Sequence, residues 1–522
     1  MATDIDKYDL ESMQQIDIVA TGRFRNAPQW IRDMTPEELA KKEVRLRRKI
    51  DARLLPMIVI MYILNYLDRN NIASAKLAGI LNDLHLSSTQ FNTSVSILFA
   101  GYLIMQGEED LPVILASTIV PSNMILNKLG KPSIYLPGCM LVWGLISGLT
   151  AAAQSYGGLL AARFVLGFVE AAYFPGCLYF LSCWYTRKEL AFRTGLLYSG
   201  SLLSGAFGGL LAAAITGGMN GVRGLSAWRW LFIIEGIVTV VVAVIAAFVI
   251  PDLPRTTKWL SEEEKQLAAW RLEADIGEDD WVDTQHQHPL HGLKLAVRDV
   301  KTWLILLIIY GSTASGSMTT FFPTVVKGLG YDSVKTLLLT APPYCIAVVL
   351  SLTNAWHADK TGERYLHIAC PPILAMAMYV LAVATTAFTP RYVAMCLMVG
   401  GTYSGYVVAL GYISNILPRP VAKRAAALAL INALSNVCQI YSPYLYPSSA
   451  APQYTTAFSV NIAMSAMTII VATVLRFYLR SLNRKLDRLE GTSIDASAQA
   501  EASREEHGLP GVAVERGFRF QL

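Results

Sequence analysis

The chain has 522 residues, of which 53% are hydrophobic and only 16% are charged, whereas soluble globular chains carry about 25% charged residues. This composition excludes disordered, collagen-like and disulfide-scaffold proteins. The formal net charge of +5 says little about nucleic-acid binding, because the distribution of charge matters more than its sum. Stretches such as residues 366–389 contain no charged residue, and about 20 helical residues cross a bilayer. We therefore expect a polytopic α-helical membrane protein.

Twelve apolar segments follow one another along the chain. They cover residues 53–73, 91–127 (interrupted), 133–153, 159–179, 194–216, 228–250, 302–325, 337–356, 366–389, 392–413, 425–445 and 455–477. Polar stretches at 1–52, 251–301 and 479–522 flank and divide them. We expect an N-terminal bundle of six helices at 53–250, a central loop, and a C-terminal bundle of six at 302–478.

The short loops differ in charge, and this difference predicts the orientation of the chain. Alternate loops carry basic residues, and the loops between them are poor in charge. The basic ones contain Lys128, Lys131, Arg187, Lys188, Arg193, Lys360, Arg364, Arg419, Lys423 and Arg424. Because Lys and Arg concentrate in cytoplasmic loops, we expect both termini and the central loop in the cytoplasm. No secretory signal precedes the first span, so we expect that span to act as the targeting signal.

Two polar segments carry helix-start signals. Thr35-Pro36-Glu37-Glu38 is a capping box with proline at the first helical position. Ser261-Glu262-Glu263-Glu264 opens a second short helix, whose Leu267 and Trp270 are available to pack along the membrane surface. The acidic clusters in both segments favour a solvated helix face over a partner site.

Residues 107–119 interrupt the second span. Glu108, Glu109 and Asp110 are adjacent there, and each acid costs about 2.5–3.5 kcal/mol at the centre of a membrane helix. A re-entrant excursion and an extra loop both remain open. A thirteenth span is disfavoured, because it would move every later basic loop to the other side. Since removal of the segment restores a clean helix, our hypothesis is a retained intron or isoform insert, which sequencing of the mature transcript would test.

Two loops resemble each other six spans apart. Asn127-Lys128-Leu129-Gly130-Lys131-Pro132 follows the second span, and Asp359-Lys360-Thr361-Gly362-Glu363-Arg364 follows the eighth. A glycine between charges permits a tight turn and lets basic groups meet helix C-termini. Read alone, these are turn residues. Their repetition favours paired cytoplasmic gate motifs between two pseudo-symmetric halves, as in secondary transporters. The gate residues are Lys128, Gly130, Lys131, Asp359, Gly362 and Arg364.

Ionisable side chains inside the membrane are functional candidates. Asp68 and Arg69 lie in the first span, and Arg163 and Glu170 in the fourth. The seven-residue separation of Arg163 and Glu170 brings both to one helix face, about 10.5 Å apart along the axis. One reading is a buried ion-pair lattice. In the other, the arginines bind a carboxylate and the acids carry a proton, all four facing a common aqueous vestibule.

Weaker candidates for the cavity are polar residues on the same or facing helices. Helix–helix hydrogen bonding is the competing explanation for each. They include Tyr62, Asn65, Tyr310, Thr313, Tyr344, Tyr403, Tyr406, Asn432, Asn436 and Gln439. The glycine pairs 205/209 and 401/405 indicate close helix packing. The seven cysteines lie singly, without metal-ligand spacing, and we expect no metal and no cofactor.

Several motifs resemble those of a known family. Asp359–Arg364 is similar to the loop motif of the major facilitator superfamily, although Asn127 replaces the usual aspartate of the first copy. Tyr66–Ile72, the Arg163…Glu170 stretch ending Phe174-Pro175-Gly176, and Trp184–Glu189 look like the anion:cation symporter branch. Within it, the resemblance points to the fungal allantoate permease group, which includes nicotinate, pantothenate and biotin carriers. The resemblance implies anion contact by Arg69 and Arg163 and proton coupling by Asp68 and Glu170.

The expected protein is a proton-coupled importer of a small organic anion, such as a monocarboxylate or vitamin-like acid, in the plasma membrane. Its expected partners are the lipid bilayer, the anion and protons, without nucleic acid, and we expect a monomer. An exporter of an acidic metabolite and a transporter-like nutrient sensor remain alternatives. An enzyme is disfavoured, because the sequence has no H-E-x-x-H motif and no nucleophile–base motif.

Overall fold

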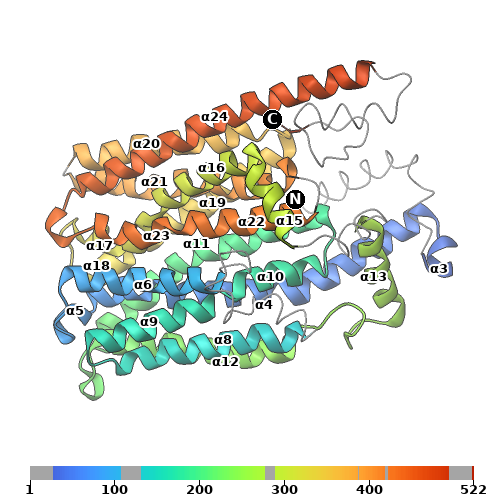
Figure 1. Ribbon diagram of the computed structural model, residues 1–522. Helices are drawn as coiled ribbons and strands as arrows, with labels where there is room; N and C mark the ends of the chain where they lie inside the picture. Colours follow the sequence, from blue (N-terminus) through green and yellow to red (C-terminus); the bar gives the residue numbers. More distant parts are fainter. Residues whose placement is uncertain are drawn as a thin grey trace.

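The structure is a computed structural model that describes residues 27–106, 131–276, 289–385, 387–417, 421–492 and 520–521. Across these ranges the chain forms helices and no strand (Figure 1). The proposed insert at 107–119 and the gate residues Lys128 and Gly130 lie outside the described residues.

The helices of the first half match the first six apolar segments. They are α4 (Pro36–Leu77), α6 (Ser88–Gln106), α8 (Pro132–Leu149), α9 (Tyr156–Glu170) with α10 (Tyr173–Ser182), α11 (Arg187–Gly218) and α12 (Ala227–Val249). Short helices α3 (Gln29–Arg32) and α5 (Ile80–Asp83) lie before α4 and after it, and α13 (Glu262–Ile276) and α15 (Pro289–Arg298) follow in the central loop.

The second half repeats the pattern. Its helices are α16 (Val300–Gly316) with η3 (Ser317–Phe321) and α17 (Phe322–Lys327), α18 (Ser333–Leu338) with α19 (Ala341–Thr361), α20 (Tyr365–Ala384), α21 (Phe388–Ile416), α22 (Val421–Asn436) with α23 (Cys438–Tyr441) and η4 (Ser442–Leu445), and α24 (Thr455–Thr492). Within the described ranges, nine helices are long and apolar enough to cross a membrane. The other three predicted spans fall on α6, on the broken pair α9–α10 and on α22–α23.

The helices lie side by side along one long axis, so the molecule has two distinct ends (Figure 1). At one, here called the α5 end, lie α5, α17 and α18; at the other, the α13 end, lie α3 and α13. Since α4 runs from the α13 end to the α5 end, its residues Asp68 and Arg69 lie in the half of the helix nearer the α5 end.

The predicted helix starts are confirmed. The hydroxyl of Thr35 accepts from the backbone N–H of Glu38, and the carboxylate of Glu38 accepts from the N–H of Thr35. The same reciprocal pair joins Ser261 and Glu264 before α13. α4 therefore begins well before the first apolar segment, and it continues through that segment as one helix of 42 residues.

The predicted packing of Leu267 and Trp270 along the membrane surface is wrong. Leu267 and Trp270 are each 2% exposed and pack in the same core cluster as Ile31 and Ile50, from α3 and α4. The acidic face of α13 is not purely solvated either, because Glu264 forms an ion pair with Lys49 at 2.7 Å. We call this packing of α13 on α3 and the first part of α4 the α13 clamp.

Glycines set how closely neighbouring spans approach. A Cβ added at Gly401 would lie 2.8 Å from the backbone nitrogen of Ala375, and one at Gly405 would lie 2.9 Å from the carbonyl of Ile368. α20 and α21 therefore pack backbone to backbone, as the spacing of these two glycines predicts. A Cβ at Gly205 would lie 2.5 Å from the ring of Tyr344, so the other predicted pair allows α11 to approach α19.

The two halves touch through α11 against α18 and α19, and through α6 against α22, α23 and η4. Ser96 of α6 donates to the carbonyl of Ile440 at 2.7 Å, and the hydroxyls of Thr93 and Tyr444 lie 2.9 Å apart. Thr93 and Ser96 lie in the first half of α6, toward the α5 end. Deeper in the molecule, the rings of Tyr198 and Tyr406 meet at 5.2 Å across the halves. The α5 end is thus closed by contacts between the halves.

Candidate functional site

A buried ion pair joins the first and fourth spans. The Nε–H of Arg69 on α4 donates to the carboxylate of Glu170, the last residue of α9, at 2.9 Å. The guanidinium also lies over the rings of Tyr66 and Tyr102, at 4.9 and 4.7 Å from their centroids. A guanidinium between aromatic faces keeps its charge, with cation–π attraction replacing part of the lost hydration.

Arg163 is bound differently. Its guanidinium donates to two main-chain carbonyls of α4, those of Arg69 at 2.8 Å and Asp68 at 3.5 Å. Its Nε–H has no hydrogen-bond partner among the described residues. Arg163 is 1% exposed, so its charge lies in the interior while dipoles, rather than a carboxylate, satisfy its hydrogen bonds.

Asp68 is held by hydroxyl groups from two other helices. Ser147 of α8 donates to one carboxylate oxygen, and Thr239 of α12 donates to the other, both at 2.7 Å. Of the ion-pair lattice that the sequence left open as one of two readings, half is present: Glu170 neutralises Arg69, but no side-chain bridge joins Asp68 to an arginine within the described ranges. A carboxylate with two hydroxyl donors can stay charged without a cation in contact.

The four charged residues do not face an open vestibule in this conformation. Asp68 is 0% exposed, Arg163 and Glu170 are each 1% exposed, and Arg69 is 7% exposed. The cause is close packing around them. A Cβ at Gly167 of α9 would collide with the carbonyl of Leu98 on α6, which shows how tightly these helices enclose the site. The sequence brings the four residues to one place, but their burial is a property of the packing.

Tyrosines from both halves gather next to Arg69; we call Tyr66, Tyr102, Tyr198, Tyr403 and Tyr406 the tyrosine cluster. Ring contacts link Tyr198 to Tyr406 at 5.2 Å and Tyr406 to Tyr403 at 6.1 Å. Tyr62 links the ring of Tyr66 to that of Tyr198, with centroid distances of 5.0 and 6.5 Å. Three residues of the cluster, Tyr66, Tyr403 and Tyr406, are only half-buried, so the cluster is more accessible than the arginine that Tyr66 and Tyr102 contact.

The weaker candidates fall into different environments. Tyr62 is a core residue, stacked on Tyr173 and Phe174 at 6.2 and 5.6 Å and 2% exposed. Asn65, one turn before Arg69, is buried, and its amide nitrogen has no hydrogen-bond partner in the described part of the chain. Asn432 and Asn436 are half-buried on α22 and bind each other, the Asn436 amide donating to the Asn432 carbonyl at 2.8 Å.

The second gate motif folds as a tight helix end. Gly362 adopts a left-handed conformation (φ 67°) at the C-cap of α19, and Arg364 pairs with Asp359 at 2.7 Å across the turn. Of the first motif the structure describes Lys131, which is exposed before α8. A left-handed cap favours glycine because a Cβ would be strained there, so turn geometry alone accounts for Gly362.

Sequence reasoning missed several residues of the site. Ser147 and Thr239 hold Asp68, and hydroxyl residues in apolar helices carry no pattern that marks them. Tyr66 lies three residues before Arg69, on the same helix face, and this spacing was available from the sequence. Glu235 of α12 is a fifth ionisable residue in the membrane interior and 2% exposed; as an acid within an apolar span it carried the same signal as the other four.

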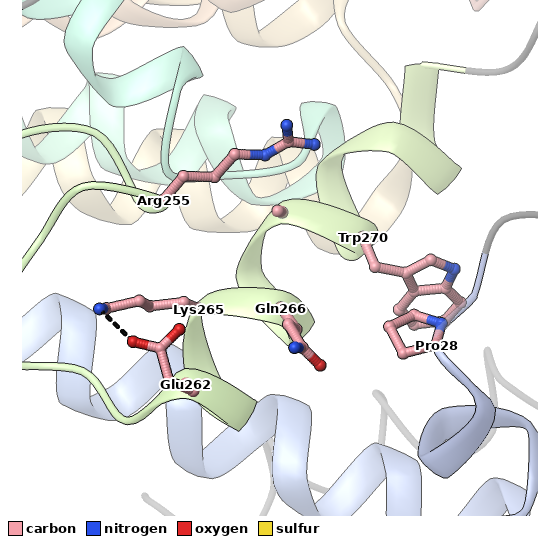
Figure 2. Close-up of a pocket in the computed structure, with 7 residues that line it drawn as sticks. Pro28, Arg255, Glu262, Lys265, Gln266 and Trp270 are labelled. Carbon is pink, nitrogen blue, oxygen red and sulfur yellow. Dashed lines mark hydrogen bonds and ion pairs between the residues drawn. The ribbon is translucent and has the colours of Figure 1, made fainter.

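A cavity of about 340 Å³ lies elsewhere, at the α13 clamp (Figure 2). It is lined by Pro28, Arg255, Glu262, Lys265, Gln266, Ala269 and Trp270. Lys265 pairs with Glu262 at 2.6 Å, and Gln266 accepts from the indole of Trp30 at 2.7 Å. This opening belongs to the packing of α13 and is remote from the buried charges. No metal-binding cluster of His, Cys, Asp or Glu occurs within the described ranges.

The chain resembles known transporters in sequence. The "MFS transporter prlL" of Fungal sp. (strain NRRL 50135) is 33% identical over 459 residues, which cover 85% of this chain and 88% of that protein. A protein of Agrobacterium vitis named "Putative tartrate transporter" is 31% identical over 402 residues, 77% of this chain and 87% of that protein.

The fold is also found among solved structures. An inward-facing, occupied bacterial homologue of the human lysosomal transporter Spinster superposes with a TM-score of 0.58 at 15% identity, over 82% of this chain and 96% of that one. The xylose transporter XylE from E. coli, in a partially occluded inward-open conformation, gives 0.55 at 17% identity, over 81% and 97%. Residues 58–443 match the family model described as Major Facilitator Superfamily. The chain therefore belongs to the major facilitator superfamily and is a membrane transporter with the all-helical fold of that family, not an enzyme.

Proposed function

We propose that this transporter carries a small organic anion into the cell together with protons, by alternating access across the plasma membrane. The observation that supports this most directly is the ion pair between Arg69 and Glu170, placed beside the tyrosine cluster where the two halves meet. A cation and an acid that bind each other in the interior can exchange partners, because the acid can take up a proton and the cation can then bind an anion.

The pair suggests how the two fluxes are coupled. In the structure the carboxylate of Glu170 occupies a hydrogen-bonding edge of Arg69. A proton on Glu170 removes its charge and weakens this bond, and the carboxylate of a substrate then takes its place on the guanidinium. Release of the substrate restores the ion pair after the proton has left. With one proton carried for each singly charged anion, no net charge crosses the membrane, so the pH gradient drives the uptake and supplies about 1.4 kcal/mol per pH unit.

Closure of the site is compatible with this cycle. The four charges are enclosed in this conformation, and the α5 end is closed by contacts of α6 and α11 with the second half. In alternating access, rigid halves rock around a central site. Access to Arg69 then requires the halves to separate at the tyrosine cluster, where Tyr198 and Tyr406 face each other.

The arginines and one relative support the proposed substrate class. Two guanidinium groups suit a carboxylate, and the Agrobacterium vitis relative bears a name that refers to tartrate. Membership of the allantoate permease group is part of this proposal. The opposite direction, export of an acidic metabolite, uses the same residues and is decided by the assay below, as is a sensor without transport.

The test is uptake by purified protein in liposomes with an imposed pH gradient. Nicotinate, pantothenate, biotin, allantoate and tartrate are the first compounds to screen. We expect gradient-dependent uptake of at least one. Transport only in the reverse direction would replace import by export. Tight binding of an anion without any flux in either direction would favour the sensor.

Variants then test the residues. We expect Arg163→Ala to abolish anion binding, and Glu170→Gln to retain anion exchange while losing its dependence on pH. Exposed Arg298→Ala and Glu262→Gln are matched controls outside the site. Normal transport by Arg163→Ala would remove this arginine from the site, and a Glu170→Gln protein that still follows the pH gradient would remove Glu170 from coupling.

A further inference from the structure

Glu235 is a buried acid for which the proposed cycle has no role. It lies on α12, is 2% exposed, and its Oε2 has no hydrogen-bond partner among the described residues. Thr239, one turn later on the same helix, donates to Asp68. Residues four apart share a helix face, so Glu235 faces α4 together with Thr239.

The packing of α12 confirms this direction. A Cβ at Gly236 would lie 2.6 Å from the Cα of Gly148 on α8, so α12 packs closely on α8 at this level, and α12 also contacts α4. On α4, Asn71 is the neighbour of Glu235, and the charges of Glu235 and Asp68 act on each other. Both polar atoms of the Asn71 amide are buried without a hydrogen-bond partner in the described part of the chain. Glu235 therefore faces a polar group and an acid, not a cation.

The remaining charged groups around Glu235 bind elsewhere. Arg69 pairs with Glu170, and Arg163 donates to main-chain carbonyls of α4. On the α5 side, Arg229 donates to the carbonyl of Ala151, and Lys76 lies over the ring of Phe91 on α6. On α8, the residue that donates to Asp68 is Ser147, which carries no charge.

The formal charges of the four buried residues sum to zero without Glu235. Arg69 and Arg163 carry two positive charges, and ionised Asp68 and Glu170 carry two negative ones. An ionised Glu235 would leave one negative charge uncompensated in the interior, and such a charge is very costly unless it is neutralised by a proton. With Glu235 included, the five buried side chains are neutral in sum only if one of their three carboxyl groups holds a proton.

We infer that Glu235 holds this proton and exchanges it with Asp68, which makes it a further proton-carrying residue of the transport cycle. In the exchange the O–H bond of Glu235 breaks, an O–H bond forms on Asp68, and Glu235 becomes the anion; the pair keeps a net charge of −1. α12 begins at the α5 end, so Glu235 lies about 6 Å nearer that end than Thr239. A proton arriving from the α5 end meets Glu235 before Asp68.

This inference rests on the proposed proton coupling, but its first test does not require transport. Infrared difference spectra of the full-length protein in lipid nanodiscs report the C=O band of a protonated carboxyl group near neutral pH. We expect Glu235→Gln to lose one such band, whereas Glu235→Asp and the exposed Glu262→Gln keep it. In Asp68→Asn the band also disappears, because Glu235 then supplies the missing negative charge.

The outcomes separate the parts of the inference. An unchanged band in Glu235→Gln shows that Glu235 is not the proton carrier, and a band that persists in Asp68→Asn shows that the two acids do not share the proton. Gel filtration checks that each variant is folded. If the Glu235→Gln protein is misfolded, the Glu235→Asp variant keeps the test decisive.

Transport gives the second test. One proton coupled to a gradient of one pH unit supports about tenfold accumulation. We expect Glu235→Gln to lower accumulation about tenfold under this gradient while anion exchange without a gradient persists. Full pH-driven accumulation by Glu235→Gln would overturn the role in the cycle. If the wild-type protein itself shows no pH-driven uptake, the proposed function fails, and the infrared result still decides where the proton is.

Discussion

At the scale of single residues, the central feature is a cation that has several partners. Arg69 binds the carboxylate of Glu170 and lies between the rings of Tyr66 and Tyr102, whereas Arg163 binds backbone carbonyls. The two arginines thus differ in what a substrate must displace. At Arg69 it competes with a charged acid, and at Arg163 it finds a guanidinium whose Nε–H is unpaired in the described part of the chain.

We predict that Arg69→Met destabilises the protein by about 3–5 kcal/mol, because Glu170 is left as a buried carboxyl without its cation. The double variant Arg69→Met/Glu170→Met should recover much of this loss, since neither charge remains. Thermal unfolding in detergent measures both. Equal destabilisation by the single and double variants would show that the ion pair is not the cause.

At the scale of helices, main-chain contacts through glycine decide how the spans pack. α6 and α9 approach each other through Gly101 and Gly167, each of which faces a carbonyl of the other helix. The same helix α9 carries Arg163 and Glu170, which are hydrogen-bonded to α4. The part of α4 that precedes the first apolar segment packs differently, in the α13 clamp, where Lys49 pairs with Glu264.

We predict that Gly167→Ala costs about 1–3 kcal/mol by overpacking, because its Cβ would strike the carbonyl of Leu98. Gly157→Ala, on the same helix, is the matched control, since a Cβ there meets no atom within 4 Å. Thermal unfolding compares the two. A Gly167→Ala protein as stable as Gly157→Ala would mean that α6 and α9 separate easily.

The α13 clamp should respond to acid. Burial alone would raise the pKa of Glu264, but the hydrogen bonds from Lys49 and from the backbone of Ser261 outweigh it and hold the pKa below its usual range. A lowered pKa stabilises the clamp above the unfolded value of about 4.3, and this contribution is lost as the pH falls through the lowered pKa.

The fluorescence of Trp259, which lies under Lys49 and stacks on Trp184 at 6.0 Å, measures this loss; Trp259→Phe provides the background. We expect Glu264→Gln to weaken the clamp at neutral pH and to flatten its acid titration. An unaltered titration in Glu264→Gln would assign the acid response to another group.

At the scale of the whole molecule, the halves are held together at the α5 end. α11 approaches the second half through Gly205 and Gly209, which face Tyr344 and Thr340, and α6 adds the bonds of Thr93 and Ser96. These contacts must break when the α5 end opens. The residues that form them therefore control the balance between conformations without touching the buried charges.

We predict that Gly209→Val favours conformations open at the α5 end, because its side chain cannot fit against Thr340. A cysteine introduced at Thr93 should then react faster with a membrane-impermeant maleimide. Gly218→Val, on the same helix, has no atom within 4 Å of the new Cβ and is the control. Equal labelling in both backgrounds would show that this contact does not hold the end closed.

The sequence by itself determined where the spans lie, where α4 and α13 begin, and that the glycine pairs 205/209 and 401/405 pack closely. These properties are local: hydropathy, capping residues and small side chains act on their own segment or on the helix next to it. The sequence also identified Asp68, Arg69, Arg163 and Glu170 as charges within the membrane, since each is costly there.

Only the tertiary structure decided how those charges are paired. In the structure Arg69 pairs with Glu170, Asp68 accepts from two hydroxyl groups, and Arg163 donates to two carbonyls. Glu235 lies close to the same charged residues. The tertiary structure also packed Leu267 and Trp270 of α13 against α3 and α4, where the sequence predicted that they pack along the membrane surface. The physical reason is that pairing depends on the rotation and depth of each helix against its neighbours, and these are set by packing between segments far apart in the chain.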